Sequence, residues 1–228
     1  GIGATIVMPT TVTAIKRAGV ERYGATLQLA GTTTDDRQSA AEALSRYRGA
    51  VIVPPYDNAA IIAGQATCGL EIMNDQPAAT TVVVPVGGGG LSGGTATIVK
   101  LLRPAARVVV VEPEGAAKLS AAWKAGSPVR IESSASSADG LLAVRIGALN
   151  FAHLRRFADE VITVSEKEIA VAAAYMFREL KLVAEPSGAT TIAALLAGKI
   201  AATGETVAIL SGGNVSLAAL NAFCADAE

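Results

Sequence analysis

Strand-length apolar runs alternate with longer segments of helical period along this 228-residue chain. Residues 80–86 are almost continuously apolar rather than alternating, which is typical of a strand buried on both faces. Strands of this kind form parallel sheets, and the periodic segments between them supply the helices that cover each face. The sequence therefore predicts an α/β fold with parallel sheets.

The pattern places an element boundary near the double proline Pro54-Pro55. We expect residues 1–57 to form the remainder of a small α/β domain and residues 58–228 to form a larger α/β domain. Strands are predicted at residues 4–7, 25–29, 50–53, 80–86, 107–111 and 206–210. Helices are predicted at residues 11–18, 37–47, 58–73, 90–102 and 187–196, with one more running from a capping box at Ser165 and Glu168 to residue 182.

Composition excludes several classes of function. The net charge is −1, and the lysines and arginines are spread along the chain without a long basic run, so no basic face is predicted for binding nucleic acid. The apolar runs are too short to span a bilayer. The first residues lack a basic leader pattern and the two cysteines lie far apart, so the reducing cytoplasm is the expected location.

Four consecutive glycines, Gly87, Gly88, Gly89 and Gly90, separate the predicted strand at 80–86 from a predicted helix. Without side chains, a backbone can approach an anion closely, and the N–H groups that begin a helix attract negative charge. The pattern predicts a phosphate cradle, whereas a plain strand-to-helix turn would need fewer glycines. The spacing fits neither the Walker loop nor the dinucleotide-binding loop.

A second loop, Ser211-Gly212-Gly213-Asn214, follows the predicted strand at 206–210. Open α/β sheets bind their ligands at the carboxyl ends of their strands, so Ser211 is expected to face the same crevice as the glycines. Taken alone, this loop is an equally good strand-end turn.

Six motifs occur in the order and approximate spacing of one enzyme family, at residues 62–67, 84–91, 111–115, 138–141, 185–189 and 210–214. With these motifs the whole chain resembles the fold-type II enzymes that depend on pyridoxal 5′-phosphate (PLP), and among them the threonine/serine dehydratases and serine racemases. The resemblance implies the family's two parallel-sheet α/β units, which are similar to those of the tryptophan synthase β chain, with PLP bound by the larger one.

The resemblance also implies roles for individual residues. Gly87 to Gly90 together with Leu91 would hold the PLP phosphate, and Ser211 would hydrogen-bond the pyridine nitrogen. A carboxylate at that place would keep the nitrogen protonated, whereas a neutral hydroxyl makes the ring a weaker electron sink, which suits rapid expulsion of a β-hydroxyl. The implied reaction is β-elimination from threonine or serine, giving a 2-oxo acid and ammonia, in a homodimer or tetramer.

The family's Schiff-base lysine lies in a Ser-x-Lys-x-Arg-Gly context that does not occur in this sequence. The family's Ser-x-Gly-Asn-His loop is absent as well. We therefore expect no catalytic residue in this chain, which corresponds to a family member without its amino-terminal portion and is expected to be inactive as it stands. The seven lysines are Lys16, Lys100, Lys118, Lys124, Lys167, Lys181 and Lys199.

Three further positions carry expectations. Glu112 and the Ala116 carbonyl align with a divalent-cation site of serine racemases, but Lys118 stands where a carboxylate is expected. An ammonium would repel the cation, so no metal is predicted. His153 is interpreted as a histidine on a helix face, and Cys68 as core packing.

Three alternatives remain open from the sequence alone. The first is a serine racemase or a dehydratase acting on another hydroxy amino acid. The second is a non-catalytic module that binds a different phosphorylated ligand in the cradle. The third is a fragment that does not fold alone, because strand edges would lack their partners.

Overall fold

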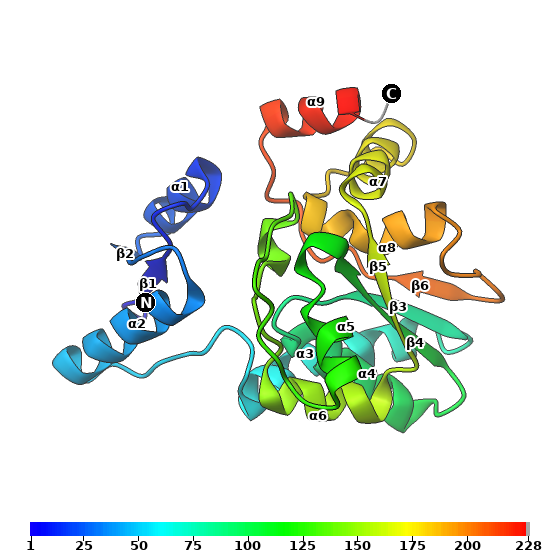
Figure 1. Ribbon diagram of the computed structural model, residues 1–228, viewed down its shortest axis with the longest axis horizontal. Coiled ribbons are helices and arrows are strands. Elements are labelled where there is room, and N and C mark those ends of the chain that lie inside the picture. Colours follow the sequence, from blue (N-terminus) through cyan, green and yellow to red (C-terminus); the bar gives the residue numbers. More distant parts are fainter. Residues whose placement is uncertain (227–228) are drawn as a thin grey trace. The chain divides into compact units, whose positions relative to one another are not determined.

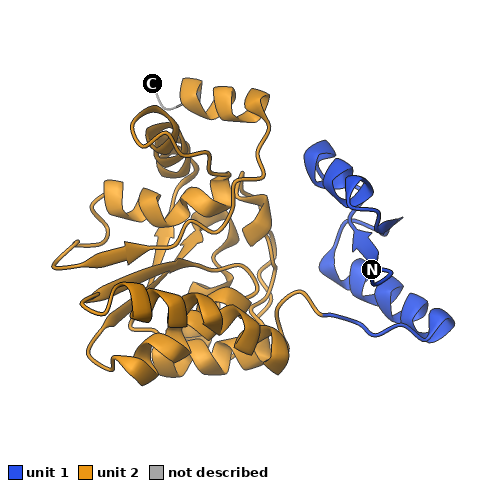
Figure 2. Cartoon of the chain, turned by 180° about the vertical axis from the view of Figure 1, so that it is seen from behind, with its two compact units in different colours: residues 1–53 blue, residues 54–228 orange. Residues whose placement is uncertain are grey.

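The structure, a computed structural model, describes residues 1–226. The chain divides into two compact units, Gly1–Val53 and a second unit that begins at Pro54 (Figure 2). The division falls a few residues before the predicted boundary at residue 57. Residues 54–57 belong to the second unit because Tyr56 and Asp57 pack and hydrogen-bond there. None of the described helices is long and apolar enough to cross a membrane.

Unit 1 has two parallel strands and two helices. Strand β1 (Thr5–Met8) pairs with β2 (Thr26–Leu29) in a register that aligns Thr5 with Thr26. Helix α1 (Ala14–Arg22) connects the strands, and α2 (Thr34–Arg48) follows β2. Thr33 and Asp36 form a capping box at the start of α2.

The predicted strand at residues 50–53 is wrong. Within residues 1–53, which the structure describes throughout, the sheet consists of β1 and β2 only. Val51 and Val53 are 90% and 75% exposed. Residues 50–53 form no strand, and Pro54 and Pro55, which follow, have no N–H with which to extend any pairing.

Unit 2 contains a parallel four-stranded sheet in the order β5-β4-β3-β6. Helices lie on both sides of this sheet (Figure 1). The strands are β3 (Thr81–Pro85), β4 (Arg107–Pro113), β5 (Glu160–Val164) and β6 (Thr206–Ala208). The helices are α3 (Ala59–Asp75), α4 (Gly90–Leu102), α5 (Lys118–Ala125), α6 (Ala148–Phe157), α7 (Glu166–Arg178), α8 (Pro186–Leu196) and α9 (Leu217–Asp226), with the 3-10 turns η1 (Glu114–Ala116) and η2 (Asp139–Leu141).

Alternate residues of the central strands face two separate cores. Val82 and Val84 pack with apolar residues of α3, α4, α5 and α6. Val83 and Val109 pack with residues of α7 and α8 on the other side. Successive side chains of a strand point to opposite faces, so a continuous apolar run fills both cores. All five residues of β3 are buried, as the sequence predicts for a central strand.

Candidate functional site

The glycine loop lies at the carboxyl end of β3, where α4 begins. Val86 continues the pairing of the sheet by donating its N–H to the Val111 carbonyl at 2.9 Å. Gly89 is the N-cap of α4 and has φ +102°, a conformation that favours glycine. No side chain caps this helix. The first N–H groups of α4 are therefore left for a ligand or solvent, and they carry the positive end of the helix dipole.

Protein atoms lie close to three of the four glycines. A Cβ added at Gly88 would lie 2.2 Å from the Tyr56 ring. At Gly89 it would lie 2.7 Å from the Asn150 side chain, and at Gly87 it would lie 3.0 Å from the Gly140 carbonyl. Close packing by protein atoms thus accounts for part of the glycine run that the sequence analysis ascribes to phosphate binding.

Residues before α3 and at the start of α6 contact the glycine loop and hold it in position. The Gly88 carbonyl accepts hydrogen bonds from Asn150 Nδ2 at 3.0 Å and from the Gly147 N–H at 3.1 Å. The Asp57 carboxylate accepts from the N–H groups of Ala148 and Leu149 at 2.9 and 3.0 Å, so it caps α6. The site therefore includes Tyr56, Asp57 and Asn150, which the sequence analysis does not single out.

The Ser211 loop follows the strand next to β3. Strands β3 and β6 are hydrogen-bonded neighbours, and the Ile209 N–H donates to the Val83 carbonyl at 3.0 Å. The Gly212 carbonyl accepts the Glu185 N–H at 3.1 Å, just before α8. Parallel neighbours end at the same edge of a sheet, so the two glycine-containing loops follow neighbouring strands at that edge. Ser211 itself is exposed.

A buried ion pair lies close to the start of the glycine loop. The side chains of Lys118 and Glu112 are both 0% exposed, and Lys118 Nζ lies 3.6 Å from Glu112 Oε2. Nζ also donates to the carbonyls of Val86 at 2.7 Å and Leu141 at 3.0 Å. Burial lowers the pKa of Lys118 to about 8 from its ordinary value of 10.5, and the charge of Glu112 partly opposes that decrease.

The remaining candidate positions lie in helices of unit 2. His153 Nδ1 lies 2.8 Å from Thr97 Oγ1, which joins α6 to α4. Cys68 packs against the core as predicted, and burial raises the pKa of its thiol. Within residues 1–226, no three His, Cys, Asp or Glu side chains are grouped so that they could hold a metal ion.

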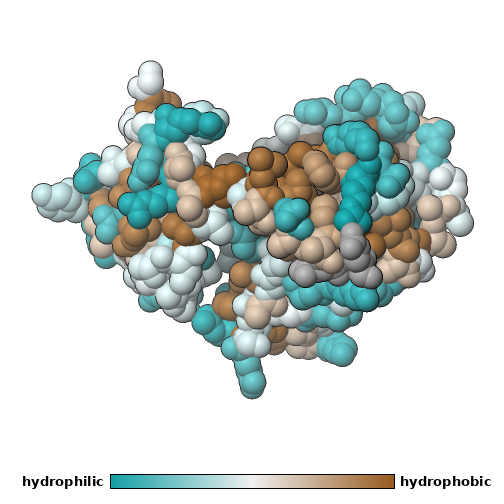
Figure 3. Space-filling view, turned by 90° about the horizontal axis from the view of Figure 1, so that it is seen from above, coloured by the Kyte–Doolittle hydropathy of each residue, from teal (hydrophilic) through white to brown (hydrophobic). Residues whose placement is uncertain are grey.

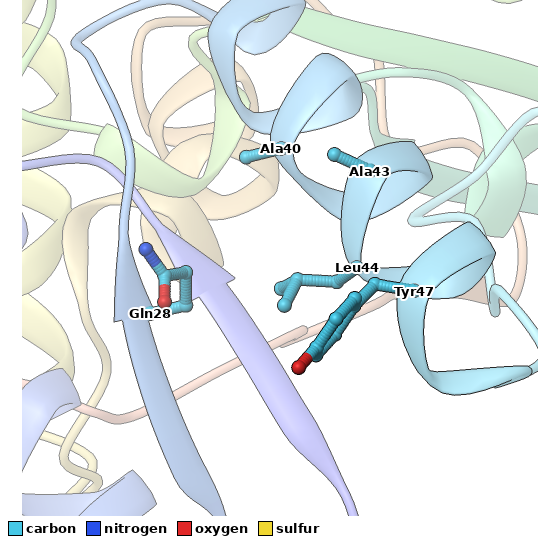
Figure 4. A pocket seen from close by; sticks show the side chains of 5 residues that line it. All are labelled: Gln28, Ala40, Ala43, Leu44 and Tyr47. Atoms are coloured by element: carbon cyan, nitrogen blue, oxygen red, sulfur yellow. The ribbon is translucent and has the colours of Figure 1, made fainter.

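A separate hollow lies within unit 1, between β2 and α2 (Figure 4). This open hollow has a volume of about 330 Å³ and is lined by Gln28, Ala40, Ala43, Leu44 and Tyr47. None of these five side chains is charged. We assign it no role in catalysis.

The sheet order and the two loops at one sheet edge define a parallel α/β unit in which α4 begins without a side-chain cap. Residues 1–212 match the family described as "Pyridoxal-phosphate dependent enzyme". The chain belongs to this family, whose members depend on PLP.

Named relatives agree with the membership. An L-threonine ammonia-lyase of Thermotoga maritima is 39% identical over 218 residues, which are 95% of this chain and 54% of that protein. The biosynthetic L-threonine dehydratase of Escherichia coli is 39% identical over 221 residues, which are 95% of this chain and 43% of that protein. The chain spans about half the length of these curated relatives.

Solved structures show the same fold. A serine racemase from maize is similar with a TM-score of 0.90 and 32% identity, over 97% of this chain and 69% of that chain. The processed form of threonine deaminase isoform 2 from Solanum lycopersicum has a TM-score of 0.89 and 34% identity, over 99% of this chain and 66% of that chain. These similarities confirm the predicted fold class.

Proposed function

We propose that the protein is a PLP-dependent enzyme that removes the β-hydroxyl of threonine or serine and releases a 2-oxo acid and ammonia. The observation that carries this proposal is the placement of the Ser211 loop beside the glycine loop, at the ends of the neighbouring strands β6 and β3. The relatives named threonine ammonia-lyase and threonine dehydratase support the choice of substrate.

In this proposal the two loops hold opposite ends of one cofactor. The N–H groups of Gly87 to Gly90 and of Leu91, at the uncapped start of α4, bind the phosphate. Ser211 hydrogen-bonds the pyridine nitrogen without protonating it. Asn150 and Tyr56 keep the loop in place from one side. Bound PLP would supply an electron sink for the bond between Cα and its proton in the amino acid.

The amine that joins PLP to the protein is proposed to lie outside these 228 residues. None of the seven lysines has the family's sequence context, and Lys118, which is fully buried, is already engaged by Val86, Leu141 and Glu112. Borohydride reduction of the full-length protein followed by peptide mass analysis tests this assignment. A PLP adduct on a lysine of this chain would overturn it.

The reaction itself is tested on the full-length protein with each enantiomer of serine and threonine. We expect visible absorbance that survives dialysis and bleaches with borohydride, together with release of 2-oxo acid and ammonia. Ser211→Ala should lower kcat about tenfold through loss of one hydrogen bond to the ring. Ser127→Ala, at an exposed position after α5, is the matched control and should leave kcat unchanged. A colourless protein that binds other phosphorylated ligands would indicate a non-catalytic module.

Serine racemase is the second candidate, because the maize serine racemase has a TM-score of 0.90 with this chain. Appearance of D-serine from L-serine in the same assay would favour it over the dehydratase. Assembly as a homodimer or tetramer and a cytoplasmic location remain proposals. Light scattering of the full-length protein measures the first, and fluorescence microscopy of the tagged protein tests the second.

A further inference from the structure

Lys118 begins α5, yet its whole side chain is enclosed by protein and 0% exposed. Lysines are almost never fully buried unless they are paired, since an ammonium loses its hydration there. A methionine would fill a similar volume at this position without that loss. The need to fill space therefore does not explain why a lysine stands at this position, whereas the contacts of its ammonium group do.

Three oxygen atoms from separate segments converge on Lys118 Nζ. They are the carbonyl oxygens of Val86 and Leu141, at 2.7 and 3.0 Å, and Glu112 Oε2 at 3.6 Å. Glu112 is held in turn by the N–H groups of Leu119 and Ser120, at 2.9 and 2.7 Å. The arrangement is a small oxygen cage with one net negative charge, and the ammonium fills it.

The contacted carbonyls belong to segments that form the proposed cofactor site. Val86 directly precedes the glycine loop, and Leu141 ends η2. The neighbouring Gly140 donates its N–H to Ser187 Oγ at 3.0 Å, at the start of α8. Glu185, just before α8, donates its N–H to Gly212, the residue after Ser211. A chain of contacts therefore runs from the ammonium to both loops.

We propose that Lys118 is a positioning residue, whose ammonium serves as a tethered cation that joins the glycine loop to η2 and makes the loop independent of any dissolved cation. This proposal rests on the proposed function only in its consequence for PLP affinity. That the glycine loop is well ordered in the protein without PLP follows from the contacts of Lys118 alone.

The test uses the full-length protein and two readouts, which are hydrogen exchange of residues 84–93 without PLP and the dissociation constant of PLP. In Lys118→Met we expect faster exchange in this segment and about tenfold weaker PLP binding, through loss of charge-assisted hydrogen bonds. Lys124→Met, at an exposed lysine of the same helix, is the matched control and should change neither readout. Unchanged exchange in a folded Lys118→Met protein would overturn the proposal.

Lys118→Ala provides a rescue experiment. Propylammonium has the three carbons and the nitrogen that this substitution removes, so it should restore slow exchange in residues 84–93. Tetramethylammonium at equal ionic strength has no N–H donor and should not. Equal restoration by both ions, or by neither, would contradict a role for the ammonium.

The wild-type protein gives a test that does not depend on any variant folding. In a metal-free buffer whose added salt is tetramethylammonium chloride, the exchange of residues 84–93 should equal that in potassium or magnesium buffer. A loop that is ordered only when potassium or magnesium is present would overturn the proposal. A wild-type protein that keeps an ordered loop but binds no PLP would instead overturn the proposed function.

Discussion

Units 1 and 2 are built from the same kinds of elements, parallel strands joined by helices, but they differ sharply in burial. None of the residues 1–53 is buried, whereas every residue of β3 in unit 2 is buried. Both units begin a helix with a capping box, Thr33 with Asp36 and Ser165 with Glu168. Local signals therefore suffice to begin helices in both units, but only unit 2 has layers of side chains that stabilise its sheet from both faces.

Apolar side chains of unit 1 are consequently left at the surface. Tyr47 is 87% exposed and Val51 is 90% exposed. Brown hydrophobic patches interrupt the hydrophilic surface on the face of the molecule drawn in Figure 3. Substitutions that depend on close packing should accordingly affect unit 2 more strongly than unit 1.

The largest effect is expected from a glycine at a helix crossing. A Cβ at Gly94 in α4 would lie 2.5 Å from the Ile62 carbonyl oxygen and 2.7 Å from the Ala66 nitrogen of α3. Gly94→Ala must separate two helix backbones, and we expect a loss of about 3 kcal/mol in the free energy of unfolding. Urea unfolding followed by circular dichroism measures it.

Gly19→Ala in α1 is the matched substitution in unit 1. A Cβ there meets no atom within 4 Å, and alanine favours a helix, so a gain of up to about 1 kcal/mol is expected. Equal destabilisation by the two substitutions would contradict the contrast between the units.

A smaller effect is expected from the cap of α6. Asp57→Ala removes the acceptor for the N–H groups of Ala148 and Leu149, which should lower the free energy of unfolding by about 1–2 kcal/mol. Hydrogen exchange at residues 147–150 should increase, because the N–H groups of Ala148 and Leu149 lose their acceptor. The same segment also holds the Gly88 carbonyl, through the Gly147 N–H. Asp75→Ala, at the exposed end of α3, removes no cap and should be nearly neutral.

The smallest effect concerns acid stability. Burial acts to raise the pKa of Glu168, but hydrogen bonds from Lys199 and Ser165 outweigh it and hold the pKa below its ordinary value of 4.5. The folded state thus binds fewer protons, and the stabilisation is present above about pH 4.5 and is lost as the pH falls through the folded pKa. Glu168→Gln should reduce this acid dependence by about 1 kcal/mol or less, measured by thermal melts over a pH series.

The equivalent carboxylate in unit 1 sharpens the comparison. Hydrogen bonds from Thr33 and Thr32 lower the pKa of Asp36, which caps an exposed helix. Asp36→Asn should change hydrogen exchange within α2 and leave the acid dependence of unit 2 as it is. A change in the hydrogen exchange of α7 instead would show that the capping boxes of α2 and α7 are coupled.

Most of the elements of unit 2 could be predicted because their signals are local. The continuous apolar run of β3 and the capping box of α7 lie within a few residues of the elements they specify. The same reasoning failed at residues 50–53, where an apolar run has no strand to pair with. It also missed β5, although residues 160–164 include β-branched side chains that favour a strand.

Only the parts of the site that are continuous in sequence could be predicted, because only these have local signals. The glycine loop and the Ser211 loop are continuous motifs, and their neighbouring positions follow from the rule for parallel strands. Tyr56, Asp57 and Asn150 contribute through contacts between residues that are distant in sequence, and no local pattern announces such contacts. The sequence shows only that Lys118 would repel a metal ion, whereas its complete burial results from tertiary contacts.

The order of strands in the sheet has a consequence for synthesis on the ribosome. Strand β3 lies between β4 and β6, and its register aligns Thr81 with Thr206. While the chain is being translated, one edge of β3 has no strand to pair with until β6 has left the exit tunnel. An apolar edge exposed for that interval is where a chaperone would bind the nascent chain and where premature association between neighbouring polysomes would begin.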